Sequence, residues 1–347
     1  MAEKAVSLND VARSAEVSVS TVSRYLNGQL ALSDVTESRI LDAIERTGYE
    51  RAPRRSRSEA GSPPRSVIGL VIPQVDNSYY GAIAEAAVSA AEAHGIHVVV
   101  VSTLNHSRKQ LDYVELLTAI GVSGILYVGS YRSNSALADV VTSGLPVVVV
   151  DEQLSGMPPV DTVLVDDYAG AYQATTYLLS LGHRSIGVLT GPEGLGSVSE
   201  RRRGWRDALL RYDVDPDEQF SASGAFSDDF GAAALSHLLA DPHTPTAVFA
   251  ASDIIALGLL GAARRLGVSV PGELSVVGFD DLPASSLVTP RLTTVRTPVQ
   301  TMAETAVSLL VDRLHGVQDA PRTSITSVSL IVGDSTAVVL PASAVNA

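Results

Sequence analysis

Two carboxylates and a pair of tyrosines stand at positions where a polar small molecule could bind. Asp151 directly follows the apolar run Val147–Val150, and Asp280 closely follows a second apolar run at 275–278. Such runs are typical of buried parallel strands, and parallel sheets bind ligands beyond the carboxyl ends of their strands. Carboxylates accept hydrogen bonds from hydroxyl groups, and Tyr79 or Tyr80 could stack on a sugar ring or a base. One of the two tyrosines is expected to belong to the core instead.

A second group of side chains, in residues 18–27, has the chemistry needed to bind DNA. Arg24 can donate two hydrogen bonds to guanine, Ser20 can bond several base edges, and the methyl groups of Val19 can pack on thymine. Short polar side chains beside them suit phosphate oxygens, which fix the position of a protein without reading sequence. These candidate phosphate contacts are Ser18, Thr21, Ser23 and Asn27.

The elements that must position these DNA-binding candidates are two short helices joined by a tight turn. Ser7 and Asp10 form a capping-box start for a helix from Leu8, and Ser18 can cap a second helix over Val19–Leu26. Asn27 and Gly28 end it. A third helix is predicted over 34–46, and its apolar residues, Ile40, Leu41 and Ile44, are expected to close a small three-helix core. This is the outline of a helix-turn-helix domain.

The residue pattern of this segment resembles the LacI-type family, the lac repressor and its relatives. It carries Asp10-Val11-Ala12, Ala15, Val17-Ser18, Thr21-Val22-Ser23-Arg24, Ser33 and Gly48-Tyr49, and the resemblance extends to about residue 335. Glu16 departs from the usual glycine of the turn, which would cost on the order of 1 kcal/mol if this residue takes positive φ. The resemblance implies a transcription regulator, in which Ser7 and Leu8 also contact DNA. Two such units of a homodimer would meet successive major grooves of a near-palindromic operator.

The resemblance also assigns an effector site. Asp76–Tyr80 is similar to the family's Asn-Pro-aromatic-aromatic turn, with Ser78 in place of proline, and Arg201, Gly204 and Trp205 match a further motif. Phe226 follows a short strand where the family often has an aromatic wall. A neutral sugar or polyol suits this set, whereas Asp253 is expected only to cap the next helix. The candidate effector-binding residues are Asn77, Tyr79, Tyr80, Asp151, Arg201, Phe226, Ser252 and Asp280.

From Val67 onward, short apolar runs alternate with helical segments, which predicts parallel sheets covered by helices on both faces. The expected fold is an N-terminal all-α helix-turn-helix domain followed by a two-lobed α/β effector domain similar to periplasmic binding proteins. The resemblance implies that the last helix and strands cross back, so that both lobes are discontinuous. The expected divisions are residues 1–49 for the DNA-binding domain, 50–66 for a linker, 67–335 for the effector domain and 336–347 for a flexible tail. The expected strands are 67–72, 97–102, 124–128, 147–150, 163–165, 186–189, 247–251, 275–278, 324–328 and 329–332.

The linker is basic and contains no leucine. Residues 51–65 hold five arginines and one glutamate, and the segment is rich in Pro, Gly and Ser, which predicts that it is flexible. The family uses a hinge helix here that wedges a leucine into the minor groove, but none occurs between Tyr49 and Val67. Either a smaller residue, Ala52, Pro53 or Ala60, serves as a weaker wedge, or the operator is contacted here mainly through arginines and phosphates. We favour the second interpretation, with contacts chiefly from Arg54, Arg55 and Arg57.

Composition narrows the class and the compartment. The net charge is −13, but residues 1–66 hold ten Lys or Arg against nine Asp or Glu, so the remainder carries −14 and the basic charge stays beside the helix-turn-helix. The sequence has no cysteine, which excludes disulfides and thiolate chemistry. Neither a signal peptide nor a long apolar run is evident, so we expect a cytoplasmic protein without a membrane partner.

Catalysis is not expected. His183 has no partner at a catalytic spacing, residues 191–196 lack the Lys-Ser/Thr ending of a phosphate loop, and His94, His97 and His106 match no metal motif. Hence no catalytic residue, metal or cofactor is predicted. Residues 337–347 lack the leucine heptad by which some family members form tetramers, which favours a dimer. The missing hinge leucine leaves one alternative, a cytoplasmic sugar-binding protein that does not regulate DNA.

Overall fold

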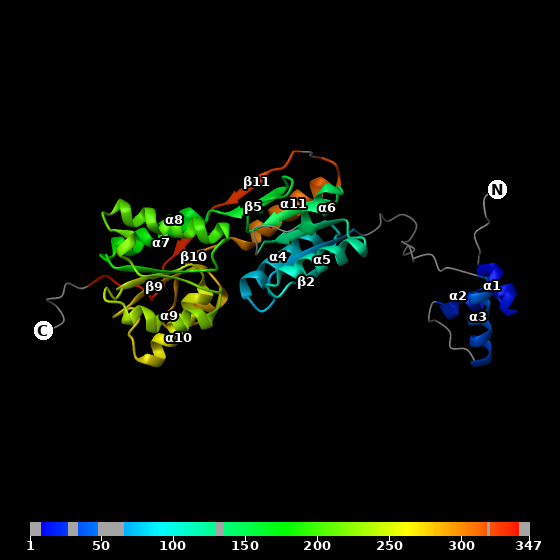
Figure 1. Cartoon of the computed structure of the whole chain (residues 1–347), viewed down its shortest axis with the longest axis horizontal. Helices are drawn as coiled ribbons and strands as arrows, with labels where there is room; N and C mark the ends of the chain where they lie inside the picture. The colour runs from blue at the N-terminus through cyan, green and yellow to red at the C-terminus, as the bar shows by residue number, and fades with distance from the viewer. Residues whose placement is uncertain (1–7, 27–33, 48–65, 130–134, 318–319, 340–347) are drawn as a thin grey trace. The chain divides into compact units, whose positions relative to one another are not determined.

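The protein divides into two compact units, residues 1–64 and 65–347, and each is described by itself. The structure is a computed structural model that describes residues 8–26, 34–47, 66–129, 135–317 and 320–339 (Figure 1). Residues 50–65 of the predicted linker, the tail from residue 340, and the candidates Ser7, Asn27, Arg54, Arg55 and Arg57 lie outside these ranges. In the described residues, no helix is long and apolar enough to span a membrane.

The first unit contains the predicted three helices. They are α1 (Leu8–Ala15), α2 (Val19–Leu26) and α3 (Asp34–Thr47). Ser18 caps α2, because its Oγ accepts a hydrogen bond from the amide of Thr21 at 3.0 Å. The buried core of the unit consists of small and β-branched side chains, which allows short helices to pack closely: Val11, Ala12, Ala15, Val22, Ile40 and Ala43.

Two sequence-based expectations about this unit have definite outcomes. Leu41 does not close the core, since it is 51% exposed, and the position one turn on from Ile40 that faces inward is Ala43. The prediction for Leu41 was wrong because successive helical residues turn by about 100°, so Ile40 and Leu41 cannot both face a narrow core. Glu16 does take positive φ, at 52°, and its carboxylate pairs with Arg39 at 2.8 Å.

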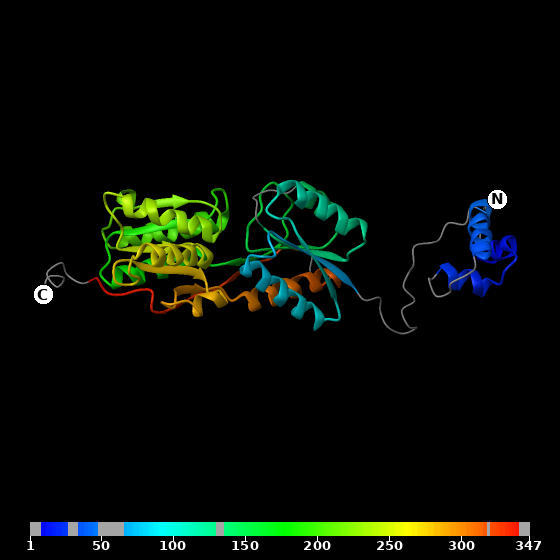
Figure 2. The ribbon, with the colours of Figure 1, turned by 90° about the horizontal axis from the view of Figure 1, so that it is seen from below.

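The second unit contains two six-stranded sheets. The sheet of the N-terminal lobe has the order β11-β5-β4-β3-β1-β2, in which every pairing is parallel. Helices α4 and α11 cover one face and α5 and α6 the other (Figure 2). The elements of this lobe are β1 (Val67–Ile72), α4 (Ser78–Glu92), β2 (His97–Ser102), α5 (Ser107–Ala119), β3 (Gly124–Val128), α6 (Ser135–Thr142), β4 (Val147–Val150), β5 (Asp161–Val165), α11 (Val299–Leu314) and β11 (Thr323–Thr326).

The sheet of the C-terminal lobe has the order β12-β10-β9-β8-β6-β7, and β12 is its one antiparallel strand. Helices α7 and α8 cover one face, and α9 and α10 cover the other. The elements are α7 (Asp167–Ser180), β6 (Ile186–Thr190), α8 (Gly196–Arg211), β7 (Ser221–Ser223), α9 (Asp228–Ala240), β8 (Ala247–Ala250), α10 (Asp253–Leu266), β9 (Ser275–Asp280), β10 (Thr293–Arg296) and β12 (Ser329–Ile331).

The chain crosses between the lobes three times, as the family resemblance implied. It passes from β5 to α7, returns from β10 to α11, and crosses again from β11 to β12. Figure 1 shows the late segments α11 and β11 beside the early strand β5. Both lobes are therefore discontinuous in sequence, and strand-end residues far apart in the chain meet in one place.

The segment predicted as a tail from residue 336 begins within the C-terminal lobe. The Thr336 hydroxyl bonds the hydroxyls of Tyr177 and Thr293, and the Val339 amide donates to the carbonyl of Leu181. His183 is buried in the same region and bonds Ser275 and the carbonyl of Ala337. Residues 336–339, which the sequence placed in the tail, therefore make hydrogen bonds to segments of the C-terminal lobe that are distant in sequence.

Candidate functional site

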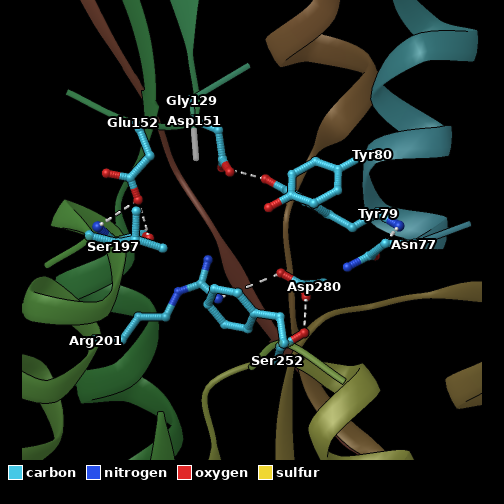
Figure 3. Close-up of a pocket in the computed structure, with 12 residues that line it drawn as sticks. Asn77, Tyr79, Tyr80, Gly129, Asp151, Glu152, Ser197, Arg201, Ser252 and Asp280 are labelled. Atoms are coloured by element: carbon cyan, nitrogen blue, oxygen red, sulfur yellow. Dashed lines mark hydrogen bonds and ion pairs between the residues drawn. The ribbon is translucent and has the colours of Figure 1, made fainter. Parts of the chain in front are cut away.

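A small pocket lies beyond the carboxyl ends of the strands of both sheets, and it brings together all eight residues predicted from the sequence (Figure 3). Its cavity measures about 20 Å³, which is room for about one water molecule. The lining also includes four residues that the sequence did not single out. The full lining is Asn77, Tyr79, Tyr80, Gly129, Asp151, Glu152, Leu195, Ser197, Arg201, Phe226, Ser252 and Asp280.

The two strand-end aspartates have unusual backbone conformations. Asp151, directly after β4, has φ of 73°, and Asp280, the last residue of β9, has φ of 116°. Left-handed conformations of residues other than glycine are unfavourable, by about 1–3 kcal/mol each, and they concentrate at functional sites. Here they turn both carboxylates into the pocket, where Asp151 is 7% exposed and Asp280 is 6% exposed.

Arg201 is the cationic centre of the pocket, and its donors are largely used by the chain itself. It lies on α8, where its Nε donates to Asp167 at 2.7 Å and its Nη1 donates to the carbonyl of Ala251. The guanidinium also lies 3.8 Å from the centroid of the Phe279 ring and 3.8 Å from a carboxylate oxygen of Asp280. Burial alone would lower the pKa of Arg201, but Asp167 and Asp280 hold it above its usual value. The guanidinium is thus fixed in a charged, stacked position.

Asp151 is held on the N-terminal lobe by a tyrosine. The Tyr79 hydroxyl donates to its Oδ1 at 2.5 Å, and the rings of Tyr79 and Tyr80 meet edge to face with centroids 5.4 Å apart. Both tyrosines are buried in the core, and both also line the pocket. The expected division into one core ring and one binding ring is therefore not seen. Burial, reinforced by repulsion from Asp167, raises the pKa of Asp151 to about 7.

Asp280 occupies the corresponding place on the C-terminal lobe. Its Oδ2 accepts a hydrogen bond from the Ser252 hydroxyl at 2.8 Å, and burial raises its pKa to about 7 even though Arg201 lowers it. Ser252 is also the residue before α10, so the pairing joins the ends of two neighbouring strands, β8 and β9. Phe226, from the segment after β7, is half-buried and completes the wall on this lobe.

Glu152 is a pocket residue that sequence reasoning missed. It is 3% exposed and extends from the end of β4 to the N-terminus of α8 in the other lobe. One carboxylate oxygen accepts from the Gly196 amide at 2.8 Å, and the other accepts from the amide and hydroxyl of Ser197. Gly129 makes room for it, because a Cβ there would lie only 2.6 Å from that of Glu152. The contact joins residues 44 and 45 positions apart, which no local pattern reveals.

The expectation that Asp253 caps the next helix was wrong. Asp253 is the first residue of α10 and fully buried, and its carboxylate accepts from the amide of Leu282 and the hydroxyls of Ser285 and Thr294. It therefore braces the segment after β9 that follows Asp280. The cap rule failed because long-range donors offered this carboxylate better partners than its own helix.

The described DNA-binding candidates lie on the first two helices and, for Ser18, at the residue before α2. Leu8 begins α1, and Val19, Ser20, Thr21, Ser23 and Arg24 all belong to α2. Val19 is 41% exposed, as a base contact would require, and Ser18 is exposed beside it. No group of three or more metal-ligating side chains occurs in the part of the chain that the structure describes.

Comparison with known proteins places both units. The model of bacterial regulatory proteins of the lacI family matches residues 7–52, and that of the periplasmic binding protein-like domain matches residues 175–336. The HTH-type transcriptional regulator MalR of Streptomyces coelicolor is 34% identical over 341 residues, which is 95% of this chain and 96% of that protein.

The chain belongs to the lacI family of bacterial regulatory proteins. Two solved structures of similar proteins cover almost the whole chain. The transcriptional regulator CelR in complex with cellobiose has a TM-score of 0.73 at 29% identity, covering 95% of this chain and 99% of that one. The lac repressor dimer bound to operator and the anti-inducer ONPF has a TM-score of 0.72 at 27% identity, covering 96% and 100%.

Membership of the lacI family confirms the predicted fold class and the prediction of a DNA-binding transcription regulator. The alternative, a binding protein that does not regulate DNA, rested on the hinge without leucine. The family match over residues 7–52 and the matches over nearly full length favour the regulator instead. The relatives compared are regulators rather than enzymes.

Proposed function

We propose that this regulator binds its operator as a homodimer and that a small hydroxyl-rich effector, a sugar or related polyol, binds between the two lobes and controls that affinity. The observation that carries the proposal is the pocket itself. Its carboxylates lie at strand ends of two sheets, its arginine lies on α8 and its tyrosines lie on α4, and all of them converge on one cavity (Figure 3). Acceptors for hydroxyl groups beside rings for apolar ring faces are the combination that sugar recognition needs.

The size of the cavity supports control by movement of the lobes. At about 20 Å³ it is far smaller than the roughly 150 Å³ that holds a benzene-sized ring. A sugar therefore enters only when the lobes separate or the lining rearranges. An effector that binds one arrangement of the lobes more tightly raises the population of that arrangement. If the two arrangements differ in operator affinity, the effector changes operator affinity by linkage.

The similar proteins support the two ligands of this proposal. CelR was solved with cellobiose, and the lac repressor was solved as a dimer on operator DNA. For this chain we propose repression of a near-palindromic operator, with Arg24 reading a base pair in each half-site and Val19 and Ser20 contributing to the same major-groove contact. A protein that acts on the bacterial chromosome works in the cytoplasm, and we propose that location.

The test is operator binding by the full-length protein, measured by fluorescence anisotropy on DNA from upstream of its own gene. Wild type should bind in a salt-dependent manner, and a sugar found by screening should change the affinity. Arg24→Ala should weaken specific binding by about 1–3 kcal/mol and relax preference at one base pair per half-site. Competitor DNA of unrelated sequence provides the control. An equal loss of specific and non-specific binding would make Arg24 a phosphate contact instead.

A further inference from the structure

The pocket contains two elements that ordinarily attract anions, and carboxylates of the chain itself satisfy both. One is the N-terminus of α8, a helix of 16 residues whose first two amides donate to the carboxylate of Glu152. Such helix ends bind phosphates and carboxylates through free amides and the helix dipole. The other is the guanidinium of Arg201, one turn further along the same helix face from Ser197.

At the N-terminus of α8, the side chain of Glu152 lies where an anionic group of a ligand would bind. The residue before the helix, Leu195, supplies no capping side chain. Glu152 instead accepts from the amides of Gly196 and Ser197, at 2.8 and 3.2 Å, and from the Ser197 hydroxyl. Figure 3 shows this carboxylate joined to Ser197. The helix end is thus an anion site with an internal occupant.

The rest of the pocket is already rich in negative charge. Asp167 and Asp280 both pair with Arg201, which is the one cationic side chain among the described residues that line the cavity. Burial and neighbouring carboxylates raise the pKa of Asp151 and of Asp280 to about 7. Negative charge in the pocket is therefore already unfavourable, and an anionic ligand group would be repelled by these carboxylates. Hydroxyl and ammonium groups, by contrast, can donate to the same carboxylates.

We propose that Glu152 is a specificity-determining residue that occupies the N-terminus of α8 and restricts the pocket to effectors without an anionic group: neutral sugars, polyols and protonated amino sugars. This rests on the proposed binding of an effector in this pocket. Sugar phosphates and sugar acids are excluded both by the occupied amides and by the surrounding carboxylates.

The test is a gain of anion binding. Inorganic phosphate is titrated into full-length wild type, Glu152→Ala and Glu152→Gln by calorimetry without DNA, against chloride at equal ionic strength. Glu152→Ala frees both amides and should bind phosphate at least roughly tenfold more tightly than wild type, which should show no saturable binding. Glu152→Gln should gain less, because its amide oxygen can still fill the site. Adding Ser197→Ala to Glu152→Ala should weaken the gained binding several-fold.

Circular dichroism shows whether each variant is folded. Phosphate binding by wild type equal to that of Glu152→Ala, or a folded Glu152→Ala without any gain, overturns the proposal. Matched ligand pairs on wild type give a second readout that needs no variant: ribose against ribose 5-phosphate, and galactose against galacturonate. Tighter binding of an anionic member, competed by its neutral partner, also overturns it. These measurements are independent of operator binding, so a chain that gains phosphate yet never binds operator DNA would refute the proposed regulation and leave the role of Glu152 standing.

Discussion

At the scale of single residues, burial controls how the charges of the pocket behave. Asp151 and Asp280 sit on left-handed backbone at the ends of two strands, each with a hydroxyl donor, and each is almost completely buried. The lost hydration of the carboxylates outweighs the attraction of Arg201, and the pKa of each rises to about 7. Since 7 is near physiological pH, the charge of the pocket depends on pH where the protein works.

Stability should therefore depend on pH through Asp151. Its pKa is about 7 in the folded protein against an ordinary value of 3.8, so the native state holds a proton that the unfolded chain has lost. The free energy of unfolding then falls as pH rises from about 4 through about 7. Asp151→Asn cannot ionise, so its stability should be close to that of wild type at about pH 4, and it should exceed wild type by about 1–3 kcal/mol at about pH 8.5, with most of the difference already present at about pH 6. Scanning calorimetry at about pH 4 and about pH 8.5 measures this, and an equal difference at the two would contradict it.

Asp280→Ala should impair the effector response and spare DNA binding. The carboxylate faces the cavity, and Arg201 keeps its closer partner Asp167 when Asp280 is removed. Folding and effector-free operator affinity should stay within a factor of a few of wild type. Effector binding should weaken by about 1.5–3 kcal/mol, the range for a lost charged hydrogen bond. An effector titration of operator binding, run beside wild type, measures the shift, and an unchanged midpoint would place the ligand elsewhere.

At the scale of elements, the position of Arg201 depends on close packing of α8 against α7. Gly204, one turn after Arg201, permits it: a Cβ there would lie 2.4 Å from the carbonyl oxygen of Tyr168 and 3.0 Å from the Cβ of Ala171. Because the nearest obstacle is backbone, the helices rather than a side chain would have to move. The glycine thus sets the distance between the two helices.

Gly204→Ala should destabilise the second unit by about 1–3 kcal/mol, the range for overpacking, and weaken effector binding because Arg201 moves with α8. Gly261→Ala on α10 is the matched control. There a Cβ would meet only the end of the Arg265 side chain at 3.6 Å, so alanine should be neutral or stabilise by up to about 1 kcal/mol. Urea unfolding of the full-length chain compares the two, and equal effects would show that the α7–α8 contact is not limiting.

Regular elements were predictable from sequence where the local pattern was strong. Runs such as Val147–Val150 identified strands because both faces of a parallel sheet are buried. Strand β10 was missed, since Thr293–Arg296 has a polar sequence lying between Pro290 and Pro298. Antiparallel β12 was assigned as a strand, but its direction depends on which strand it pairs with. Pairing between strands that are distant in sequence cannot be predicted from a short local segment.

The candidate site was predictable for a related reason, and its gaps have the same cause. Asp151 and Asp280 end strands, so the rule for parallel sheets identified them, and family motifs supplied Arg201 and Phe226. Glu152 stands next to Asp151, but its partners lie on the opposite lobe. A local cap or turn motif has its partners within a few residues, so no such motif points to this contact. Asp253 was assigned to its own helix, whereas its partners follow it by 29 to 41 positions. Tertiary hydrogen bonds decided both cases.

At the scale of the whole molecule, an effector on one unit can affect DNA binding by the other only if the assembled protein couples them. Two DNA-binding units joined in a dimer bind two half-sites at once, which raises affinity far above that of one unit. An exposed leucine of the C-terminal lobe, Leu287, is a candidate contact for a second copy. Leu287 is 82% exposed, and a cavity of about 460 Å³ on the same lobe is lined by Val268, Val270 and Pro290 together with polar residues that include Arg264 and Ser269.

Leu287→Asp should therefore weaken the dimer and, with it, operator binding. A charge buried between two apolar surfaces costs several kcal/mol unless it is paired, so the dimer should dissociate at protein concentrations where wild type remains associated. Sedimentation velocity of the full-length chain measures the association, and anisotropy on a two-half-site operator measures the loss of affinity. Leu210→Asp is the control, because Leu210 is also exposed, at 51%, but lies on α8, across the sheet from α10. It should leave both readouts unchanged. If Leu287→Asp remained dimeric at nanomolar concentration, Leu287 would not lie between the subunits. If it became monomeric but kept full affinity for the two-half-site operator, the second half-site would contribute nothing to binding. The proposed symmetric binding of a dimer would then fail.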